Sequence, residues 1–327
     1  MDQLAQPMDA RQEPLPVASH RTEFLNVFNN NPVVVVTRYV TVGQKVGYNV
    51  RFDKNYTDST LLIYMTDGML ATQMKNSPNF SQYKCIIIDE VHERTVNTDV
   101  LMAKLREIVV KRVRTDLKVV LISATLDAAG CQRYPDNAPL VQLRGRTYPV
   151  EILYLQKNVA NVEGTNDGER GLNLLPLHGS FPKEQQNQVF ARAKAGTRKC
   201  IVFTNIAETS LTIGGIVYVI DSGLVRLAQW HARIRMNALR VVPISKASAN
   251  QRAGRAGRTR PSICFRMYGK DFEDLANTNT PSIQSTNFAP TLLGLMASNT
   301  WEHLSHVNLI SLPHKYFITQ AFRDPKG

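Results

Sequence analysis

Two acidic residues and a histidine follow directly after an apolar run of strand length. The run covers residues 85–88, and Asp89, Glu90 and His92 come next. Carboxylates at the tip of a buried strand are placed to meet a polyphosphate, with Asp89 holding a phosphate-bound Mg²⁺ and Glu90 orienting and deprotonating the attacking water. A strand followed by an acidic helix cap, with His92 at the surface, explains this stretch equally well. On these residues alone, both interpretations stay open.

A second group with phosphate chemistry is the octapeptide 251–258, which holds three arginines and two glycines in regular spacing. Glycines let a helix start approach a phosphate closely, and arginines stabilise the negative charge that develops during phosphoryl transfer. We therefore expect Arg255 and Arg258 to act as arginine fingers and Gln251 to sense the γ-phosphate or the attacking water. A generic basic patch would not need the glutamine and the glycine spacing, so the functional interpretation is favoured.

Two further polar stretches come at the exits of expected strands. The tripeptide Ser-Ala-Thr at 123–125 follows the apolar run 119–122, and residues 204–213 follow the run 200–203. Together with residues 89–92 and 251–258, they resemble motifs II, III, V and VI of the DEAH-box RNA helicases of the spliceosomal and ribosome-assembly type. Val91 replaces the usual alanine of motif II. The resemblance extends from residue 15 to about residue 298, with gaps.

The resemblance implies an α/β fold with two tandem RecA-like domains, whose mainly parallel sheets direct their carboxyl ends toward a shared cleft. It implies ATP or another NTP and Mg²⁺ as cofactors. Asp89 would hold Mg²⁺ through water, and Ser123 and Thr125 would link hydrolysis to domain movement. The catalytic residues implied by the motifs are Asp89, Glu90, His92, Gln251, Arg255 and Arg258.

Single-stranded RNA, held through its backbone, is the partner that the resemblance implies. The matching contact positions are Arg51, Thr66, Gly68, Gly179, Ser180 and Thr204. A hydroxyl and a glycine at a helix start, as at Thr66 and Gly68, can present backbone amides to a phosphate. On the nucleotide side, Phe190 falls where the family has an aromatic that stacks on adenine, and Ser210 lies in motif V. For Arg51 and Phe190 a purely structural role stays open.

The family's phosphate loop, G-x-x-x-x-G-K-T, is absent after the strand expected at 33–36. Residues 37–45 resemble the later motif Ia joined directly to that strand, and Lys45 and Lys270 lack the required glycine spacing and following hydroxyl. Residues 158–171 are polar where the family has the strand and helix of motif IV. Each sheet is therefore expected to lack an element. Beyond about residue 299 the resemblance fades, so we expect no counterpart of the winged-helix, ratchet and OB-fold modules in these residues.

Three hypotheses follow from this combination of motifs and gaps. The chain is an NTP-driven RNA helicase that unwinds RNA or remodels ribonucleoproteins, an RNA-binding derivative without hydrolysis, or an incomplete gene product. The missing loop supports the second, because an arginine finger and a carboxylate cannot replace a whole phosphate cradle. Both gaps fall inside a sheet, which favours the third over evolved loss. A DNA helicase is the weaker alternative.

Composition agrees with a globular protein that has a polyanionic partner. The chain has 327 residues, 43% of them hydrophobic, and a net charge of +12, which suits two domains and attraction to phosphates. The four cysteines have no metal-ligand spacing and fit a reducing compartment. No apolar stretch is long enough to span a membrane, so we expect an intracellular, soluble chain. The resemblance implies a nuclear setting, ribonucleoprotein partners and a monomer.

The elements that must position these residues are expected in two domains, at 21–145 and 146–280. A flexible leader at 1–20 precedes them, and a region at 281–327 begins like a winged helix and then diverges. We expect a short helix at 21–30, a strand at 33–36, a helix at 101–114 and a hairpin within 216–242. The basic residues of 101–114, including Lys104, are expected to form a solvated face.

Overall fold

The computed structural model describes twelve stretches of the chain: residues 33–34, 45–124, 138–142, 148–155, 172–178, 181–191, 196–204, 213–231, 233–269, 275–298, 300–301 and 307–323. The chain divides into two compact units. Unit 1 comprises Met1–Arg146 and Gly294–Ile310, and unit 2 comprises Thr147–Leu293 and Ser311–Gly327. The expected leader, the helix at 21–30, most of the region around the missing phosphate loop, and residues 158–171 lie outside the described residues.

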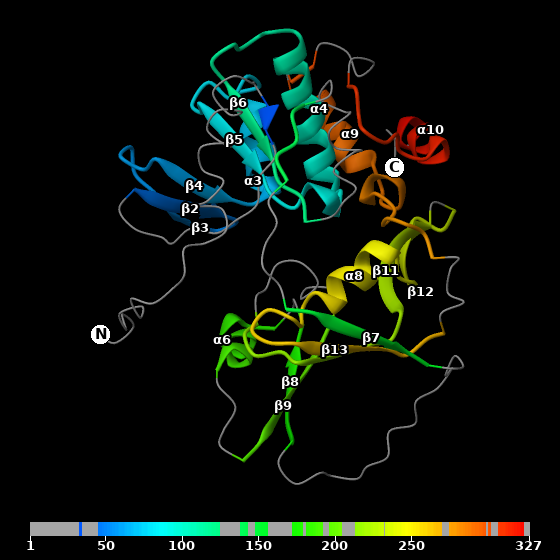
Figure 1. Cartoon of the computed structure of the whole chain (residues 1–327). Helices are drawn as coiled ribbons and strands as arrows, with labels where there is room; N and C mark the ends of the chain where they lie inside the picture. The colour runs from blue at the N-terminus through cyan, green and yellow to red at the C-terminus, as the bar shows by residue number, and fades with distance from the viewer. Residues whose placement is uncertain are drawn as a thin grey trace. The chain divides into compact units, whose positions relative to one another are not determined.

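The main sheet of unit 1 has three parallel strands in the order β1 (Val33–Val34), β6 (Lys118–Leu121) and β5 (Cys85–Ile88) (Figure 1). Cys85 pairs with Lys118 and Ile88 with Leu121, so β5 and β6 end side by side. The apolar runs of the sequence therefore become neighbouring strands, as predicted. Because both strands are parallel, the polar residues that follow them lie at the same edge of the sheet.

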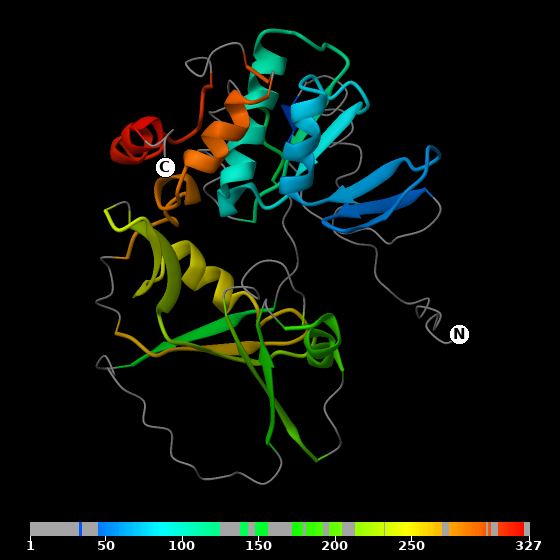
Figure 2. The same cartoon turned by 180° about the vertical axis from the view of Figure 1, so that it is seen from behind.

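A smaller sheet precedes the main one in the sequence and has the order β3-β2-β4. Strand β2 (Val46–Val50) pairs antiparallel with β3 (Asp53–Asn55) and parallel with β4 (Leu62–Met65). Figure 2 shows this sheet as a separate blue ribbon connected to α3 (Asp67–Asn76). Arg51 lies in the turn between β2 and β3. Thr66 precedes α3 and Gly68 lies in its first turn.

Helices α3 and α4 (Val96–Val110) pack against each other and, with β5 and β6, enclose the core of unit 1. Leu101, Leu105 and Ile108 of α4 are fully buried. The helix was predicted at 101–114, but it begins five residues earlier because the Thr95 side chain caps it by accepting a hydrogen bond from the Thr98 amide.

Lys104 corrects the expectation of a solvated basic face on α4. Its side chain is buried, and Nζ donates to Glu107 Oε2 at 3.0 Å and to the Thr300 carbonyl at 2.8 Å. Nζ also lies 5.3 Å from the centre of the Trp301 ring, a cation–π distance. The prediction was wrong for Lys104 because residues 300–301, almost two hundred positions away, return to unit 1 and cover this part of α4.

Unit 2 contains two parallel sheets. One has the order β10 (Tyr218–Asp221), β13 (Ser262–Arg266) and β7 (Val150–Tyr154), and the other pairs β8 (Leu172–Leu177) with β9 (Arg198–Phe203). Helix α8 (Lys246–Ala253) packs on the first sheet, with Ala253 beside Val219 and Cys264. Helix α6 (Lys183–Asn187) and the 3₁₀ turn η2 (Gln188–Phe190) lie near the second, where Val189 packs on Leu177.

Each of these sheets has one face that is strongly exposed. Tyr218 and Ile220 of β10 have exposed fractions of 65% and 74%, while Val219 between them is buried. Leu172 and Leu174 of β8 are exposed in the same way. Parallel sheets are normally covered on both faces. The expectation that an element of this domain is missing, made from the polar stretch at 158–171, concerns residues outside the described stretches and stays a prediction.

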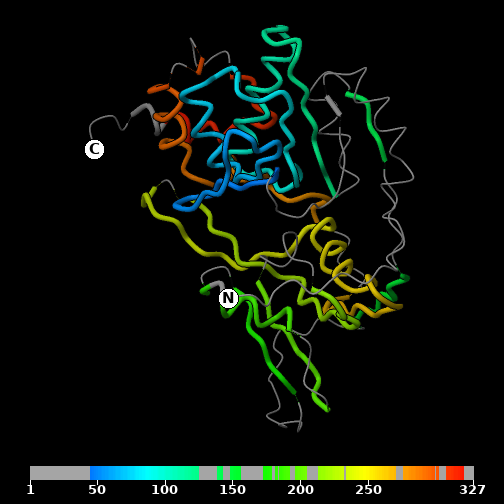
Figure 3. Tube along the Cα trace, turned by 90° about the vertical axis from the view of Figure 1, so that its left-hand side faces the viewer, coloured from blue at the N-terminus to red at the C-terminus, as the bar shows by residue number. Residues whose placement is uncertain are grey.

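The predicted hairpin within 216–242 is present. Strands β11 (Leu224–His231) and β12 (Met236–Pro243) pair antiparallel along their whole length, from Leu224 with Pro243 to His231 with Met236. Figure 3 shows them as two long neighbouring strands. The described chain then continues through η4 (Ser282–Gln284), α9 (Ala289–Met296) and α10 (Lys315–Arg323). None of the helices in these described stretches has the length and apolar composition needed to cross a bilayer.

Candidate functional site

The first candidate site is the edge of unit 1 where β5 and β6 end. The Ile122 amide donates to the Ile88 carbonyl at 2.8 Å, and the Val91 amide donates to the Ile122 carbonyl at 3.0 Å. These bonds extend the strand pairing by one residue and tie the acidic segment to the chain that leaves β6. The buried Val91 side chain anchors the 3₁₀ turn η1 (Val91–Glu93) that follows.

His92 joins the two segments of this edge. Its Nδ1 lies 3.4 Å from Glu90 Oε2, 3.5 Å from Ser123 Oγ and 3.4 Å from the Ala124 amide nitrogen. When Nδ1 carries a proton it can donate to Glu90, and when it does not it can accept from Ser123 or Ala124. Burial lowers the pKa of His92, which favours the neutral ring. The imidazole is therefore placed to switch partners between two predicted motifs.

The two carboxylates of this edge have different surroundings. Asp89 is exposed and accepts a hydrogen bond from the Glu90 amide at 2.9 Å. Desolvation by neighbouring atoms raises the pKa of Asp89, although this hydrogen bond acts in the opposite direction. Glu90 has a φ of 52° and Arg94 a φ of 50°, both left-handed. A non-glycine residue in this region costs about 1 kcal/mol or more, and such strain is often found at functional sites.

The donor set at this edge suits Mg²⁺ bound together with a phosphate. Within the described stretches, no three His, Cys, Asp or Glu side chains gather so that they could hold a metal ion by themselves. Mg²⁺ commonly uses one or two carboxylates and takes its other oxygens from phosphates and water. Asp89, exposed at a strand end, provides such a carboxylate. The residues present therefore fit Mg²⁺ as part of a metal–nucleotide complex.

Asp67 connects the acidic edge to the start of α3. Its Oδ2 accepts hydrogen bonds from the hydroxyl groups of Thr95 and Thr98, the latter at 3.3 Å, and its Oδ1 accepts from the Gly68 amide at 2.7 Å. Thr95 follows η1 and caps α4. In this structure the Gly68 amide donates to Asp67, so a phosphate contact there would require an exchange of partners. The Thr66 side chain remains exposed.

Replacement of Asp67 by alanine should lower the free energy of unfolding of the chain by about 1 to 3 kcal/mol, because it leaves two threonine hydroxyls and one amide without their acceptor. Urea denaturation measures the difference. Asp58→Ala, which removes an exposed carboxylate from the loop between β3 and β4, is the matched control and should change little. Equal effects of the two substitutions would contradict the connecting role of Asp67.

The second candidate site follows α8 in unit 2. Gln251 lies in the last turn of the helix, Gly254 ends it, and Arg255 and Arg258 come after its end. The expectation that the glycines open a helix toward phosphate is therefore wrong. Gly257 has a φ of 70°, and an added Cβ would lie 2.8 Å from the Tyr148 carbonyl oxygen. This glycine allows the loop to approach the segment before β7.

The three arginines of this octapeptide differ in their surroundings. Arg258 is exposed, and Arg255 is partly buried, with Nε 3.4 Å from the Gln251 carbonyl oxygen. Arg252 is buried and forms an ion pair with Asp221, with 2.7 Å between Nη1 and Oδ1. Arg252 also donates to the Leu224 carbonyl at 3.1 Å. Arg252 is thus held inside the unit, whereas Arg255 and Arg258 retain exposed surface.

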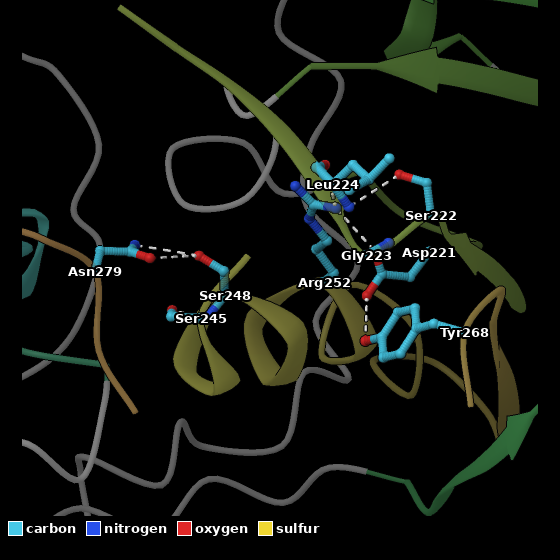
Figure 4. A network of polar contacts seen from close by, with 9 residues as sticks. All are labelled: Asp221, Ser222, Gly223, Leu224, Ser245, Ser248, Arg252, Tyr268 and Asn279. Atoms are coloured by element: carbon cyan, nitrogen blue, oxygen red, sulfur yellow. Dashed lines mark hydrogen bonds and ion pairs between the residues drawn. The ribbon is translucent and has the colours of Figure 1, made fainter. Parts of the chain in front are cut away.

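Asp221 is the centre of a buried network that the sequence did not indicate (Figure 4). Besides Arg252, it accepts hydrogen bonds from the Gly223 amide at 3.0 Å and from the Tyr268 hydroxyl at 3.0 Å. Burial and the neighbouring Asp221 carboxylate raise the pKa of Tyr268. The network joins α8, which leads into the arginine loop, to the start of the β11–β12 hairpin. An aspartate at the end of a strand was the only signal in the sequence.

Of the remaining predicted residues of unit 2, the structure describes Phe190 and Thr204. Leu177 pairs with Phe203, so the residues after both strands meet at one edge of the sheet. Thr204 is exposed there, and its amide donates to the Leu177 carbonyl at 3.4 Å. Phe190 in η2 has an exposed fraction of 48%. Thr125, Gly179, Ser180 and Ser210 lie outside the described residues.

An α/β chain with carboxylates at the strand ends of one unit and an arginine loop in the other has the organisation of two tandem RecA-like domains. Two family models match it: the DEAD/DEAH box helicase model at residues 18–133 and the helicase conserved C-terminal domain model at residues 137–260. The chain therefore carries the two domains of a DEAD/DEAH-type helicase. This confirms the predicted fold class and the coarse family assignment.

Two crystal structures of HrpB from Escherichia coli are similar to this chain. One, described as a DExH-box NTPase, has 26% sequence identity and a TM-score of 0.81, and the match covers 96% of this chain and 49% of that chain. The other, described as a DEAH/RHA helicase, has 26% identity and a TM-score of 0.80, with 94% and 50% covered. The chain spans about half the length of these structures.

Proposed function

We propose that the chain is an NTP-dependent RNA helicase of the DEAH-box type, which couples hydrolysis of ATP or another NTP to RNA unwinding or ribonucleoprotein remodelling. The observation that carries the proposal is the convergence of Glu90, Ser123 and the Ala124 amide on His92 at the ends of two parallel strands. A strand with a simple acidic cap would not need an imidazole between the two segments. The matches to both helicase domains support the same interpretation.

In this proposal, the residues of unit 1 position the reaction. Asp89 holds Mg²⁺ through water, and the ion neutralises charge on the phosphates when bound. Glu90 orients the attacking water and accepts its proton. His92 Nδ1 contacts both Glu90 and Ser123, so a change in the protonation of Glu90 changes the hydrogen bond between His92 and Ser123. Thr125 lies two residues after Ser123 in the same segment. These last residues link hydrolysis to movement between domains.

Unit 2 contributes positive charge and the nucleotide contacts. Arg255 and Arg258 stabilise charge that develops in the transition state, and Gln251 senses the γ-phosphate or water. We place the base of the nucleotide at Phe190 and another nucleotide contact at Ser210. The two helicase domains are proposed at 21–145 and 146–280, after the leader at 1–20 and before the region at 281–327.

RNA is the proposed substrate, and its backbone is the proposed point of contact. Arg51 and Thr66 are exposed in unit 1, and Thr204 is exposed in unit 2. Gly68, Gly179 and Ser180 complete the set by resemblance to the family's loops. The net charge of +12 adds a sequence-independent attraction to phosphates. The same resemblance underlies our proposals of a monomer, a nuclear location and a role in splicing or ribosome assembly.

A second candidate function is RNA binding without hydrolysis. It is favoured by one specific observation: no G-x-x-x-x-G-K-[ST] segment occurs anywhere in the 327 residues. The backbone amides of that loop normally cradle the phosphates, and neither Asp89 nor the arginines can take their place. If this function is correct, the predicted RNA contacts act without the catalytic ones.

Hydrolysis of ATP by the purified full chain, with and without single-stranded RNA, separates the two functions. The helicase proposal expects turnover that rises on addition of RNA, together with release of a labelled strand from a partial duplex. RNA binding by a monodisperse protein without turnover would overturn the helicase proposal and support the binding function. Size-exclusion chromatography of the same sample shows whether the chain is folded and monodisperse, because an incomplete gene product would aggregate.

A further inference from the structure

The turn between β2 and β3 contains an aromatic residue in a conformation that favours glycine. Val50 pairs with Asp53, which leaves Arg51 and Phe52 as a two-residue turn. Phe52 has a φ of 68°. Glycine is the residue expected at such a position, because a Cβ is strained by the adjacent carbonyl oxygen there. A phenylalanine in this turn therefore opposes the local folding preference.

No burial compensates for this strain. The exposed fraction of Phe52 is 93%, the largest among the exposed hydrophobic residues of the described stretches. Phe80 gives the contrast within the same unit, since its φ is 50° but its side chain is completely buried. The Phe80 carbonyl also accepts a hydrogen bond from Arg114 Nη1 at 2.5 Å. Phe80 thus contributes to the core, whereas the Phe52 side chain is not buried against any part of the fold.

The ring of Phe52 is already part of a cation–π pair. The Arg51 guanidinium carbon lies 4.8 Å from the centre of the ring. Lys54 adds a second exposed positive charge on β3, while the Asp53 carboxylate accepts a hydrogen bond from the Tyr48 hydroxyl at 3.2 Å. The turn therefore presents to solvent an aromatic ring with a guanidinium over one of its faces.

We propose that Phe52 is a stacking platform for one base of a single-stranded nucleic acid, with Arg51 bound to the adjacent phosphate. Every nucleobase has a π face, so a ring of this kind binds bases with little regard to sequence. An arginine beside the ring supplies the charge that tracks the backbone. A strained, exposed aromatic that lowers stability but meets a ligand follows the general relation between backbone strain and function. This inference rests on the nucleic-acid binding proposed above.

Fluorescence anisotropy with a short labelled oligouridine, titrated with the full chain, tests this platform. Phe52→Ala should weaken binding about tenfold, within the range found for loss of one base–aromatic stack. Phe52→Trp should retain affinity, and its indole emission should be quenched on addition of RNA. Leu61→Ala is the matched control, because it removes an apolar side chain that is 78% exposed in the same unit but has no ring.

Phe52→Gly distinguishes a binding role from a folding role. Glycine relieves the strain at this φ, so the melting temperature should rise or stay unchanged while binding weakens as in Phe52→Ala. Wild-type affinity in both the alanine and glycine variants would overturn the inference while leaving RNA binding intact. A chain that binds no oligonucleotide at all would overturn the proposed nucleic-acid binding itself, and the platform with it.

Discussion

Replacement of Glu90 by glutamine is expected to lower RNA-stimulated ATP turnover by about 100-fold to 10,000-fold, the range that general-base catalysis contributes. Glutamine has nearly the same shape as glutamate, but its amide cannot accept the proton of the attacking water. In the structure the Glu90 carboxylate lies 3.4 Å from His92 Nδ1, so the substitution also changes the partner of the imidazole. The kcat from a phosphate-release assay, with and without RNA, measures the loss.

Glu93→Gln is the control for this substitution, because Glu93 lies in the 3₁₀ turn that directly follows Glu90 and the change removes the same charge. We expect the kcat of that variant to stay within a few-fold of the wild type. Binding of a fluorescent ATP analogue should be unchanged in Glu90→Gln, since the residue acts on water and not on the nucleotide. Undiminished turnover in Glu90→Gln would show that another group is the base.

Replacement of Asp221 by alanine is expected to lower the free energy of unfolding by about 3 to 5 kcal/mol, the usual effect of breaking a buried ion pair from one side. Asp221 has an exposed fraction of 1%, and Arg252 one of 9%. Without the carboxylate, the Arg252 guanidinium stays buried without its counter-charge, and the Gly223 amide and Tyr268 hydroxyl lose their acceptor. Urea denaturation followed by circular dichroism provides the measurement.

Tyr268→Phe provides a graded control, because it removes one hydrogen bond and leaves the ion pair in place. Its expected effect is about 1 kcal/mol. An Asp221→Ala variant that is no less stable than Tyr268→Phe would show that water or another group replaces the carboxylate. The network includes the start of β11, so Asp221→Ala should also speed amide hydrogen exchange in the β11–β12 hairpin, relative to Tyr268→Phe.

The strands that carry the candidate site residues could be predicted, because each strand is encoded by a short run of consecutive residues. Apolar runs of strand length ended in polar residues at 89 and 123, and parallel pairing brought these ends together. The hairpin at β11 and β12 followed from two apolar runs around a polar centre. Periodicity reports such features, because a strand or a turn is encoded within a few consecutive residues.

The same reasoning failed for contacts between residues that are far apart in the sequence. Lys104 has the sequence context of a surface lysine, and only its contact with Thr300 shows why it is buried. The glycines at 254 and 257 were wrongly expected to open a helix toward phosphate, because which end of a helix they follow depends on where α8 begins. Asp67 and Asp221 carry several hydrogen bonds each, yet a single aspartate has no spacing that would indicate a network.

The path of the chain through its two units has a consequence for folding on the ribosome. Unit 1 takes in residues 294–310, so the chain leaves it, forms unit 2 and then returns. Domains usually fold in the order in which they are synthesised. Here the partners of Lys104, at 300 and 301, emerge after nearly all of unit 2. The amino-terminal unit must therefore wait, with one part of α4 uncovered, until residues 300 and 301 have been synthesised.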